Sequence, residues 1–372
     1  MKIGVPKEIK SQENRVAITP AGVHHLAGRG HEVYVEAGAG VGSGISDQDY
    51  AAAGATLLSS AADVWSAAEL LIKVKEPIAA EYPYLRSDQI VFTYLHLAAD
   101  KPQTDALLQS GTTSIAYETV QTASGALPLL SPMSEVAGRL SALVGANALL
   151  KHFGGNGTLA GGTAGVAPAK VVVIGAGVAG QNAAQIAFGL RSDVTVLDVN
   201  LARLAALDVE FGGHVKTLFS TAYSIEKAIA DADIVIGSVL IPGARAPKLV
   251  TNAMVAKAKP GSVFVDIAVD QGGCFEDTHP TTHADPTYQV HQSIIYAVAN
   301  MPGAVPRTST YALTNATLAY ATQIADKGWR KALQDNPALA RGLSTYQGKL
   351  TSAPVAQAWG YDSISIDSVL AG

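Results

Sequence analysis

The sequence of 372 residues contains only one cysteine, Cys274. One thiol cannot form an internal disulfide, and it cannot by itself build a thiolate metal cluster. The sequence also has no run of about 18 apolar residues, the length that a membrane-spanning helix requires. We therefore expect neither a disulfide framework nor a transmembrane segment.

Long stretches of one charge sign are absent as well. Lys and Arg total 26 against 31 Asp and Glu, which gives a formal net charge of -5, and no basic block suits a nucleic-acid backbone or an anionic membrane. The N-terminal residues MKIGVPKEIK carry charges where a secretory signal needs an apolar core. These features predict a cytoplasmic protein that binds neither nucleic acid nor membrane.

The hydrophobic content, 48% of residues, is sufficient for large cores, and the length exceeds what one core usually supports. Up to about residue 130, apolar runs such as KIGVP, HEVYVEAG, ELLIKVKE and IVFTYLH alternate with helical patterns. Strands separated by helices form a largely parallel sheet that is covered on both faces. The first part of the chain is therefore predicted to be an α/β domain.

A second domain is expected to begin with a long helix of small residues, in which Ser131 caps free backbone amides and Pro132 takes the first helical position. A glycine-rich loop follows, and strand–helix alternation restarts at Lys170 with about six strands, as in a complete doubly wound dinucleotide-binding domain. After Pro306 we expect an Ala- and Thr-rich helix from about 314 to 334, a shorter helix and a polar tail.

This C-terminal piece is too small to fold alone, so we assign it to the first domain. The predicted fold class is α/β, with two doubly wound domains. A Rossmann dinucleotide-binding domain, residues 130–306, is inserted into a discontinuous substrate domain formed by residues 1–129 and 307–372.

Gly175, Gly177 and Gly180 form G-x-G-x-x-G directly after an apolar strand and at the start of a helix, the context in which this motif binds a dinucleotide pyrophosphate. Asp198 ends the next strand, 18 residues after Gly180. A carboxylate there accepts hydrogen bonds from the ribose hydroxyls and repels the extra phosphate of NADP, which favours NAD. Arg203, one helical turn further on, either flanks the adenosine or is a solvated charge.

Four residues that suit catalysis or substrate binding follow predicted strands, where open parallel sheets place ligands. They are Arg15, Lys75, His96 and Asp270. Each has an ordinary structural interpretation: a surface charge for Arg15 and Lys75, a buried histidine, a turn aspartate. Their shared position at strand ends favours a joint function, but fold logic alone leaves the two interpretations about equal.

Several segments of the chain together resemble one enzyme family in their order and spacing. They are MKIGVPKEIKSQENRVAITP, LLIKVKEP, YLHLA, YETV, SPMSEVAGR, VVVIGAGVAGQNAA, VDIAVDQGGCFE and ANMPGAVPRTST. They resemble the alanine dehydrogenase family, which also contains the transhydrogenase alpha subunits, from residue 1 to about residue 350. The resemblance implies reversible, NAD-dependent oxidative deamination of L-alanine to pyruvate and ammonium, and a homohexamer.

The resemblance also implies roles for individual residues. Arg15 and Lys75 would bind substrate, and His96 and Asp270 would carry the acid–base chemistry, divided between them in a way that the sequence leaves open. Glu118 matches a possible metal contact, but without a matching second ligand we predict no metal. The residues implied to line the cofactor are Ser134, Gly175, Gly177, Val178, Ala179, Gly180, Asp198, Arg203, Ser220, Val239, Leu240, Ile267, Asp270, Val298 and Met301.

Other interpretations remain open at this point. An NAD-binding transhydrogenase subunit would share the fold without acting on an amino acid, and a saccharopine dehydrogenase would need a larger pocket. The segment THPTTHADPTYQVHQ contains His279, His283, Asp285 and His291, but it has no regular metal-ligand spacing. We interpret it as a loop near the active site.

Overall fold

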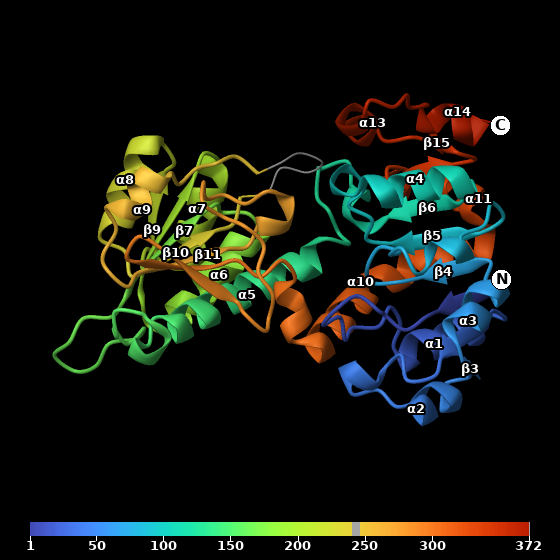
Figure 1. Ribbon diagram of the computed structural model, residues 1–372, viewed down its shortest axis with the longest axis horizontal. Coiled ribbons are helices and arrows are strands. Elements are labelled where there is room, and N and C mark those ends of the chain that lie inside the picture. Colours follow the sequence, from blue (N-terminus) through green and yellow to red (C-terminus); the bar gives the residue numbers. More distant parts are fainter. Residues whose placement is uncertain (240–245, 372) are drawn as a thin grey trace. The chain divides into compact units, whose positions relative to one another are not determined.

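The computed structural model describes residues 1–239 and 246–371. The chain divides into two compact units, Met1–Pro132 with Val305–Gly372, here called unit 1, and Met133–Ala304, here called unit 2 (Figure 1). Each unit has its own sheet, and each is described by itself below.

Unit 1 is built on a sheet that has eight strands among the described residues, in the order β15-β14-β6-β5-β4-β1-β2-β3. Strands β1 to β6 run parallel to their neighbours, while β14 is antiparallel to β6 and β15 to β14. The strands are β1 (Lys2–Val5), β2 (Glu32–Glu36), β3 (Thr56–Leu58), β4 (Leu70–Ile72), β5 (Ile90–Thr93), β6 (Thr113–Ala116), β14 (Leu343–Tyr346) and β15 (Lys349–Leu350).

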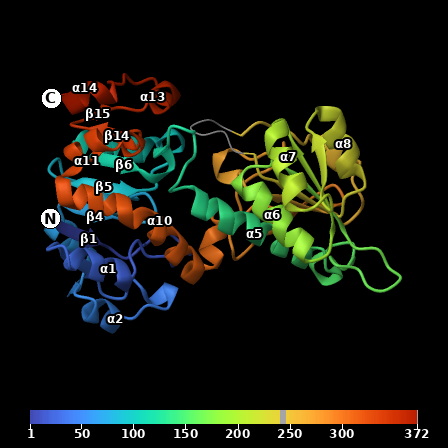
Figure 2. The ribbon, with the colours of Figure 1, turned by 180° about the vertical axis from the view of Figure 1, so that it is seen from behind.

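Helices cover both faces of this sheet. The α-helices are α1 (Pro20–Ala27), α2 (Asp47–Ala52), α3 (Ala61–Ala67), α4 (Lys101–Ser110), α10 (Pro306–Lys327), α11 (Trp329–Asp335), α12 (Pro337–Ala340), α13 (Ala353–Trp359) and α14 (Ile366–Ala371). Short 3₁₀ helices are η1 (Val41–Ser43), η2 (Tyr82–Tyr84), η3 (Leu97–Ala99) and η4 (Tyr117–Thr119). In β4, Leu71 packs with α3 and α4, whereas its neighbour Ile72 faces α1 and α10, which lie in front of the sheet in Figure 2.

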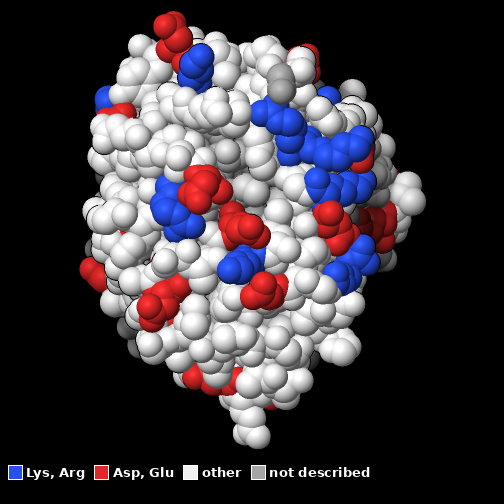
Figure 3. All heavy atoms as spheres, turned by 90° about the vertical axis from the view of Figure 1, so that its right-hand side faces the viewer, with Lys and Arg blue, Asp and Glu red and all other residues white. Residues whose placement is uncertain are grey.

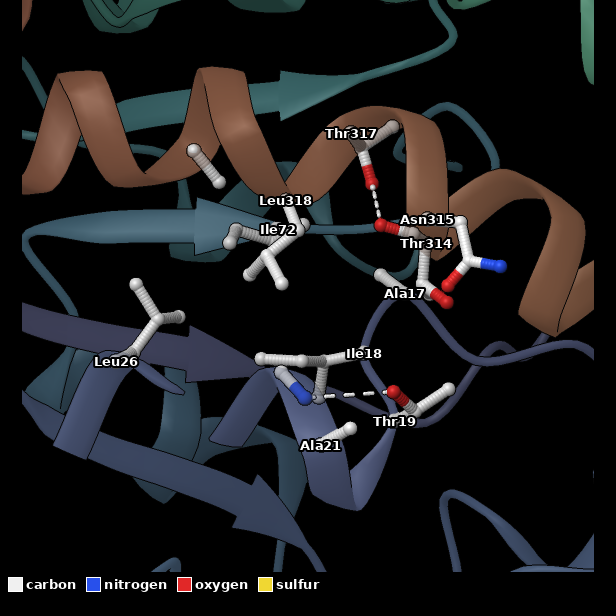
Figure 4. A pocket seen from close by; sticks show the side chains of 12 residues that line it. Ala17, Ile18, Thr19, Ala21, Leu26, Ile72, Thr314, Asn315, Thr317 and Leu318 are labelled. Carbon is white, nitrogen blue, oxygen red and sulfur yellow. Dashed lines mark hydrogen bonds between the residues drawn. The ribbon is translucent and has the colours of Figure 1, made fainter. Parts of the chain in front are cut away.

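A small cavity lies between α1 and α10 (Figure 4). Its volume is about 40 Å³, and its lining includes Ile18, Leu26 and Leu318 together with the polar residues Thr19 and Asn315. A water molecule needs about 10–15 Å³ of such space, so the cavity holds at most a few waters. It is too small for a nucleotide.

Unit 2 is built on a sheet that has seven strands in the described part of the chain, in the order β12-β13-β11-β10-β7-β8-β9. All of its strand pairs are parallel except that of β12 with β13. The strands are β7 (Lys170–Ile174), β8 (Asp193–Asp198), β9 (Lys216–Phe219), β10 (Ile234–Gly237), β11 (Val263–Asp266), β12 (Thr287–Val290) and β13 (Ser293–Tyr296).

The central strand of unit 2 is buried on both sides. Val171 and Val173 belong to a core with α5, α6 and α7, while Val172 and Ile174 belong to a second core with α8 and α9. Successive side chains of a strand point to opposite faces, so a strand covered on both faces reads as a continuous apolar run. The helices are α5 (Ser131–Ala148), α6 (Val178–Gly189), α7 (Leu201–Glu210), α8 (Ala222–Ala230) and α9 (Asn252–Ala256), with 3₁₀ helices η5 (Lys151–Phe153), η6 (Val269–Gln271) and η7 (Met301–Ala304).

The predicted α/β class with two doubly wound sheets is confirmed, but several elements differ from expectation. The helix expected at 314–334 is instead α10, which begins eight residues earlier at Pro306 and ends at Lys327, before Gly328, where φ is +74°. Proline suits the first helical position, and the polar run after it is helical because Ser309 and Thr310 are buried by tertiary packing. Strands β3, β12, β14 and β15, which lie at or next to sheet edges, were not predicted, because their pairing is set by neighbouring strands.

Helix α5 begins at Ser131, so Pro132 is its second residue and not, as predicted, its first. The Ser131 hydroxyl donates to the carbonyl oxygen of Leu127 at 2.9 Å in the preceding turn. The length of α5 and the glycine-rich loop after it agree with the prediction.

None of the helices in the described residues is long and apolar enough to cross a bilayer. On the face of the molecule in Figure 3, Lys and Arg side chains gather toward one side, with Asp and Glu side chains beside them. That mixture differs from the one-sign stripe of a nucleic-acid-binding face.

Substitutions of Gly180 and Gly189, which both lie on α6, test how closely this helix packs against the glycine turn that precedes it. A Cβ on Gly180 would lie 1.7 Å from the carbonyl oxygen of Gly175, whereas one on Gly189 would meet no atom within 4 Å. We expect Gly180→Ala to lower the free energy of unfolding by about 1–3 kcal/mol through overpacking. Gly189→Ala should raise it by up to about 1 kcal/mol. Urea unfolding measures both, and equal effects would contradict this packing.

Candidate active site

Four polar residues of unit 1 follow four parallel strands that are consecutive in the sheet. Arg15 comes after β1, Lys75 after β4, His96 after β5 and Glu118 after β6. In the strand order, β1, β4, β5 and β6 are consecutive, so these residues share the carboxyl edge of one sheet. This is the edge at which doubly wound sheets bind ligands.

Arg15 is almost fully buried, at 2% exposure, and is held by a carboxylate two residues earlier. Its Nε donates to Glu13 Oε1 at 2.7 Å and its Nη2 to Glu13 Oε2 at 2.6 Å, a two-bond fork. Burial lowers the pKa of Arg15, but the hydrogen bonds and charge of Glu13 more than offset this and raise it. The guanidinium therefore stays charged and its plane is fixed.

Lys75 belongs to a backbone segment that is hydrogen-bonded to the buried carboxylate of Glu8. Glu8 Oε1 accepts from the backbone N–H of Val74 at 2.6 Å and from that of Lys75 at 3.3 Å. The other oxygen of Glu8 pairs with Lys73 at 3.1 Å, and Lys73 also pairs with Glu81 at 2.8 Å.

Lys73 has no exposed surface, so its charge depends on these two carboxylates. Burial alone lowers the pKa of Lys73, but the charges of Glu8 and Glu81 outweigh burial and raise it. Glu8, Lys73 and Glu81 therefore form an ionic network directly before Lys75, the residue that is predicted to bind substrate.

His96 occupies a backbone conformation that is rare for residues other than glycine. Its φ and ψ are 51° and 38°, the left-handed region, and it stands at the start of η3. Glu118 stabilises the bend, because its carboxylate accepts from the backbone N–H of His96 at 2.7 Å and of Leu95 at 3.2 Å. Such backbone strain is concentrated at functional sites.

The charges along this edge also interact. Burial raises the pKa of Glu76, but the positive charges of Lys75 and Lys10, and then His96, lower it below its usual value. The ring of Tyr94 lies 5.8 Å from that of His96, and burial raises the pKa of the Tyr94 hydroxyl, which donates to the Leu129 carbonyl oxygen at 2.6 Å. Unit 1 thus brings cationic and titratable groups together at one edge.

The glycine turn of unit 2 has the geometry that a pyrophosphate requires. Gly175 has φ +107°, and a Cβ there would lie 3.0 Å from Ser238 Oγ. A Cβ on Gly177 would meet nothing closer than 4.0 Å, so the turn is open on that side. No side chain caps the N-terminus of α6, so its backbone amides are available to an anion.

Asp198 connects this turn to the end of β8. Its Oδ2 accepts from the backbone N–H of Ala176 at 2.6 Å, and its Oδ1 accepts from Asn200 N–H at 2.7 Å. The backbone N–H of Ser220 donates to the Asp198 carbonyl oxygen at 3.0 Å, so the loop after β9 joins the same region. A carboxylate has about four acceptor positions, which leaves capacity for ribose hydroxyls.

The other residues implied to line the cofactor lie near the same edge or on neighbouring elements of unit 2. Ser134 is in the first turns of α5, and Val239, Ile267 and Val298 follow β10, β11 and β13. Met301, in η7, is buried, while Val178, Ala179 and Arg203 lie on α6 and α7, Val178 and Arg203 being exposed. Leu240 lies outside the described residues.

Asp270 lies in η6, in a loop that a second aspartate closes. Asp266 Oδ1 accepts from Ala268 N–H at 3.1 Å, and its Oδ2 accepts from the N–H groups of Cys274 at 2.9 Å and Phe275 at 3.2 Å. Asp266 has no exposed surface, and burial raises its pKa although these bonds oppose the shift. The two ends of the loop that carries Asp270 are therefore fixed on one side chain.

Sequence reasoning did not find Glu8, Glu13 or Asp266. Glu13 was detectable from its spacing of two residues from Arg15, and Asp266 from its position at the end of a strand four residues before Asp270. Glu8 had no local signal, because its partner Lys73 is 65 residues away.

The histidine-rich segment does not form a metal centre. His283 Nε2 lies 2.8 Å from the Asn300 carbonyl oxygen, His291 Nε2 lies 3.0 Å from Asn252 Oδ1, and His279 stacks on Tyr288. In residues 1–239 and 246–371 no group of three His, Cys, Asp or Glu side chains could hold a metal ion.

Burial raises the pKa of the Cys274 thiol to about 12, so that thiol is unreactive.

A chain that has a dinucleotide turn on one doubly wound unit and a cationic edge on its other unit fits the class of nicotinamide-dinucleotide dehydrogenases. The family model described as alanine dehydrogenase/PNT, N-terminal domain, matches residues 4–137, and the model of its C-terminal domain matches residues 141–353. The chain belongs to the alanine dehydrogenase/PNT family. Alanine dehydrogenases of this family use NAD.

One protein of known sequence and two solved structures illustrate what the chain is similar to. An alanine dehydrogenase of Mycolicibacterium smegmatis is 64% identical over 357 residues, 96% of each chain. The structure of an L-alanine dehydrogenase is 50% identical, with a TM-score of 0.93 over 97% of this chain and 99% of that one. A transhydrogenase from Sinorhizobium meliloti is 29% identical, with a TM-score of 0.80 over 95% of this chain and 99% of that one.

Proposed function

We propose that the protein is an L-alanine dehydrogenase that reversibly converts L-alanine, NAD and water to pyruvate, ammonium, NADH and a proton. The observation that carries the proposal is the shared edge of unit 1, where Arg15, Lys75 and His96 follow consecutive strands of one sheet. A cationic pair beside a titratable histidine matches a substrate that has a carboxylate and an amino group.

The reaction sets out what each residue must do. The amino group of alanine first loses a proton, and a hydride then leaves Cα to give an iminium ion. Bound NAD supplies the hydride acceptor. Water adds to the iminium carbon, and the adduct breaks its C–N bond to release pyruvate and ammonium.

Arg15 and Lys75 bind the substrate carboxylate. Arg15 does so through guanidinium N–H groups other than those that donate to Glu13, and Lys75 acts as a point charge. His96 moves protons at neutral pH, and Asp270 stabilises the positive charge of the iminium ion. In unit 2 the residues from Gly175 to Gly180 hold the pyrophosphate, and Asp198 holds the adenosine ribose. The division between units supports residues 1–129 with 307–372 as the substrate domain and 130–306 as the NAD domain.

The relatives support this activity over that of a transhydrogenase subunit, since the alanine dehydrogenase structure is 50% identical to the chain and the transhydrogenase 29%. By family resemblance we also propose a homohexamer in the cytoplasm. Size-exclusion chromatography with light scattering measures the oligomer.

Purified protein with NAD tests the activity directly. L-Alanine should produce NADH absorbance at 340 nm, and pyruvate with ammonium should consume NADH. Glycine, L-serine and saccharopine serve as comparison substrates. Rapid turnover of saccharopine without alanine would reject the assignment, as would NADH binding with no amino acid turned over.

Asp198 predicts a strong preference for NAD over NADP. Two unit charges about 4 Å apart near a protein surface repel by roughly 4 kcal/mol before screening, enough for a large difference in kcat/KM. Asp198→Ala should narrow the gap by weakening NAD and removing the repulsion toward NADP. Steady-state kinetics with both cofactors measure this, and equal kcat/KM in the unmodified protein would be inconsistent with the role given to Asp198.

Lys75 and His96 should act on the amino or keto acid and contribute little to NAD binding, because both lie in unit 1. We expect Lys75→Ala and His96→Ala to lower turnover by about 10²- to 10⁴-fold, while the Kd for NADH stays near that of the parent. NADH fluorescence and a pyruvate-plus-ammonium assay separate the two effects. A variant that kept more than about a tenth of parental turnover would remove that residue from the mechanism.

A further inference from the structure

We propose that Thr310 and Ser43 are positioning residues for Arg15, because they fix its backbone in place through a chain of three hydrogen bonds. The inference deepens the proposed function, on which it rests, because Arg15 is there assigned to the substrate carboxylate. Thr310 lies in the second turn of α10 and Ser43 ends η1, and neither was singled out by the sequence.

The chain of bonds joins the two peptide groups that flank Arg15. The backbone N–H of Val16 donates to Thr310 Oγ1 at 3.1 Å, Thr310 Oγ1 lies 2.8 Å from Ser43 Oγ, and Ser43 Oγ donates to the Asn14 carbonyl oxygen at 2.9 Å. The peptide before Arg15 and the peptide after it are therefore fixed by one pair of hydroxyls.

The direction of the bonds follows from proton supply. Each hydroxyl has one proton to donate. Ser43 donates its proton to the Asn14 carbonyl oxygen, so in the bond between the two hydroxyls Thr310 donates and Ser43 accepts. Thr310 in turn accepts from the backbone N–H of Val16. A second acceptor near Ser43, the carbonyl oxygen of Pro306, is farther away at 3.2 Å.

The hydrogen bonds through Thr310 and Ser43 are buried, so the loss of either hydroxyl has a cost. Thr310 is 0% exposed, Ser43 1% and Arg15 2%, so water cannot replace a lost partner. Removal of either hydroxyl leaves a buried backbone group without its bond, and the cost of that is relieved by movement of the segment. The Glu13 fork fixes the guanidinium only relative to the same short segment, so a shift of residues 14–16 carries the whole side chain with it.

Other buried threonines of α10 show that this arrangement is particular to Thr310. Thr314 donates to the Tyr311 carbonyl oxygen at 3.3 Å, and Thr317 donates to that of Thr314 at 3.5 Å, both within the helix. Figure 4 shows Thr314 and Thr317 beside the small cavity. Thr317 is 2% exposed and serves as a matched control, because among the described residues its hydroxyl bonds to its own helix.

The test compares Thr310→Val, Ser43→Ala, Thr310→Ser and Thr317→Val with the parent. We expect Thr310→Val and Ser43→Ala to raise the KM for pyruvate by about tenfold, the order of effect of one lost partner in a buried hydrogen bond. The Kd for NADH should stay the same, and kcat should fall less than KM rises. Thr310→Ser keeps the hydroxyl and should restore the parental KM.

Two outcomes would overturn the proposal. One is a KM in both Thr310→Val and Ser43→Ala no higher than in Thr317→Val, and the other is failure of Thr310→Ser to restore KM. Ser43→Ala removes a single oxygen atom, and circular dichroism checks that each variant is folded.

Calorimetric titration of pyruvate into the NADH complex separates this proposal from the proposed function. A parent protein that binds pyruvate without turning it over would reject the activity, while the variants' Kd values for pyruvate would still test the positioning of Arg15. A parent that does not bind pyruvate would reject both.

Discussion

Carboxylates that accept backbone N–H groups hold the strand-end loops of both units, and the candidate site depends on them. Glu8 fixes the segment before Lys75, and Glu118 fixes the bend at His96. In unit 2, Asp198 ties the glycine turn to the end of β8, and Asp266 closes the loop that carries Asp270. Charged acceptors bond more strongly than neutral ones, so each loop keeps one conformation.

This use of carboxylates follows from the fold. Parallel strands covered on both faces leave no polar surface within the sheet, so loops that carry polar side chains gather at the carboxyl edge. Backbone N–H groups in such loops have no strand partner and need another acceptor. A buried carboxylate satisfies two or three of them at once, as Asp266 does. Glu8 accepts two such bonds and also pairs with the buried cation of Lys73.

The same requirement applies to Arg15, which is fixed by a carboxylate and by neutral hydroxyls together. Its backbone N–H donates to Glu13 Oε1 at 3.0 Å, while the Val16 N–H and the Asn14 carbonyl oxygen bond to Thr310 and Ser43. Its own side chain already pairs with Glu13, and a second buried anion beside the guanidinium would compete with a substrate carboxylate. Thr310 and Ser43 supply the hydrogen bonds that the flanking peptides need without adding charge. The substrate edge of unit 1 therefore keeps its positive character while its backbone is held.

The sequence by itself determined the two doubly wound units, the glycine turn followed by Asp198, and the strand-end positions of Lys75 and His96. These features depend on side-chain periodicity and on spacings within a single strand–turn–helix unit, which the local sequence encodes. The roles of the site residues remain predictions. Only the tertiary structure decided the antiparallel strands β14 and β15, the Lys73–Glu8 pair and the contact between Ser43 and Thr310, whose positions are 267 residues apart. Such contacts depend on which distant segments the packed cores bring together, and no local pattern records that.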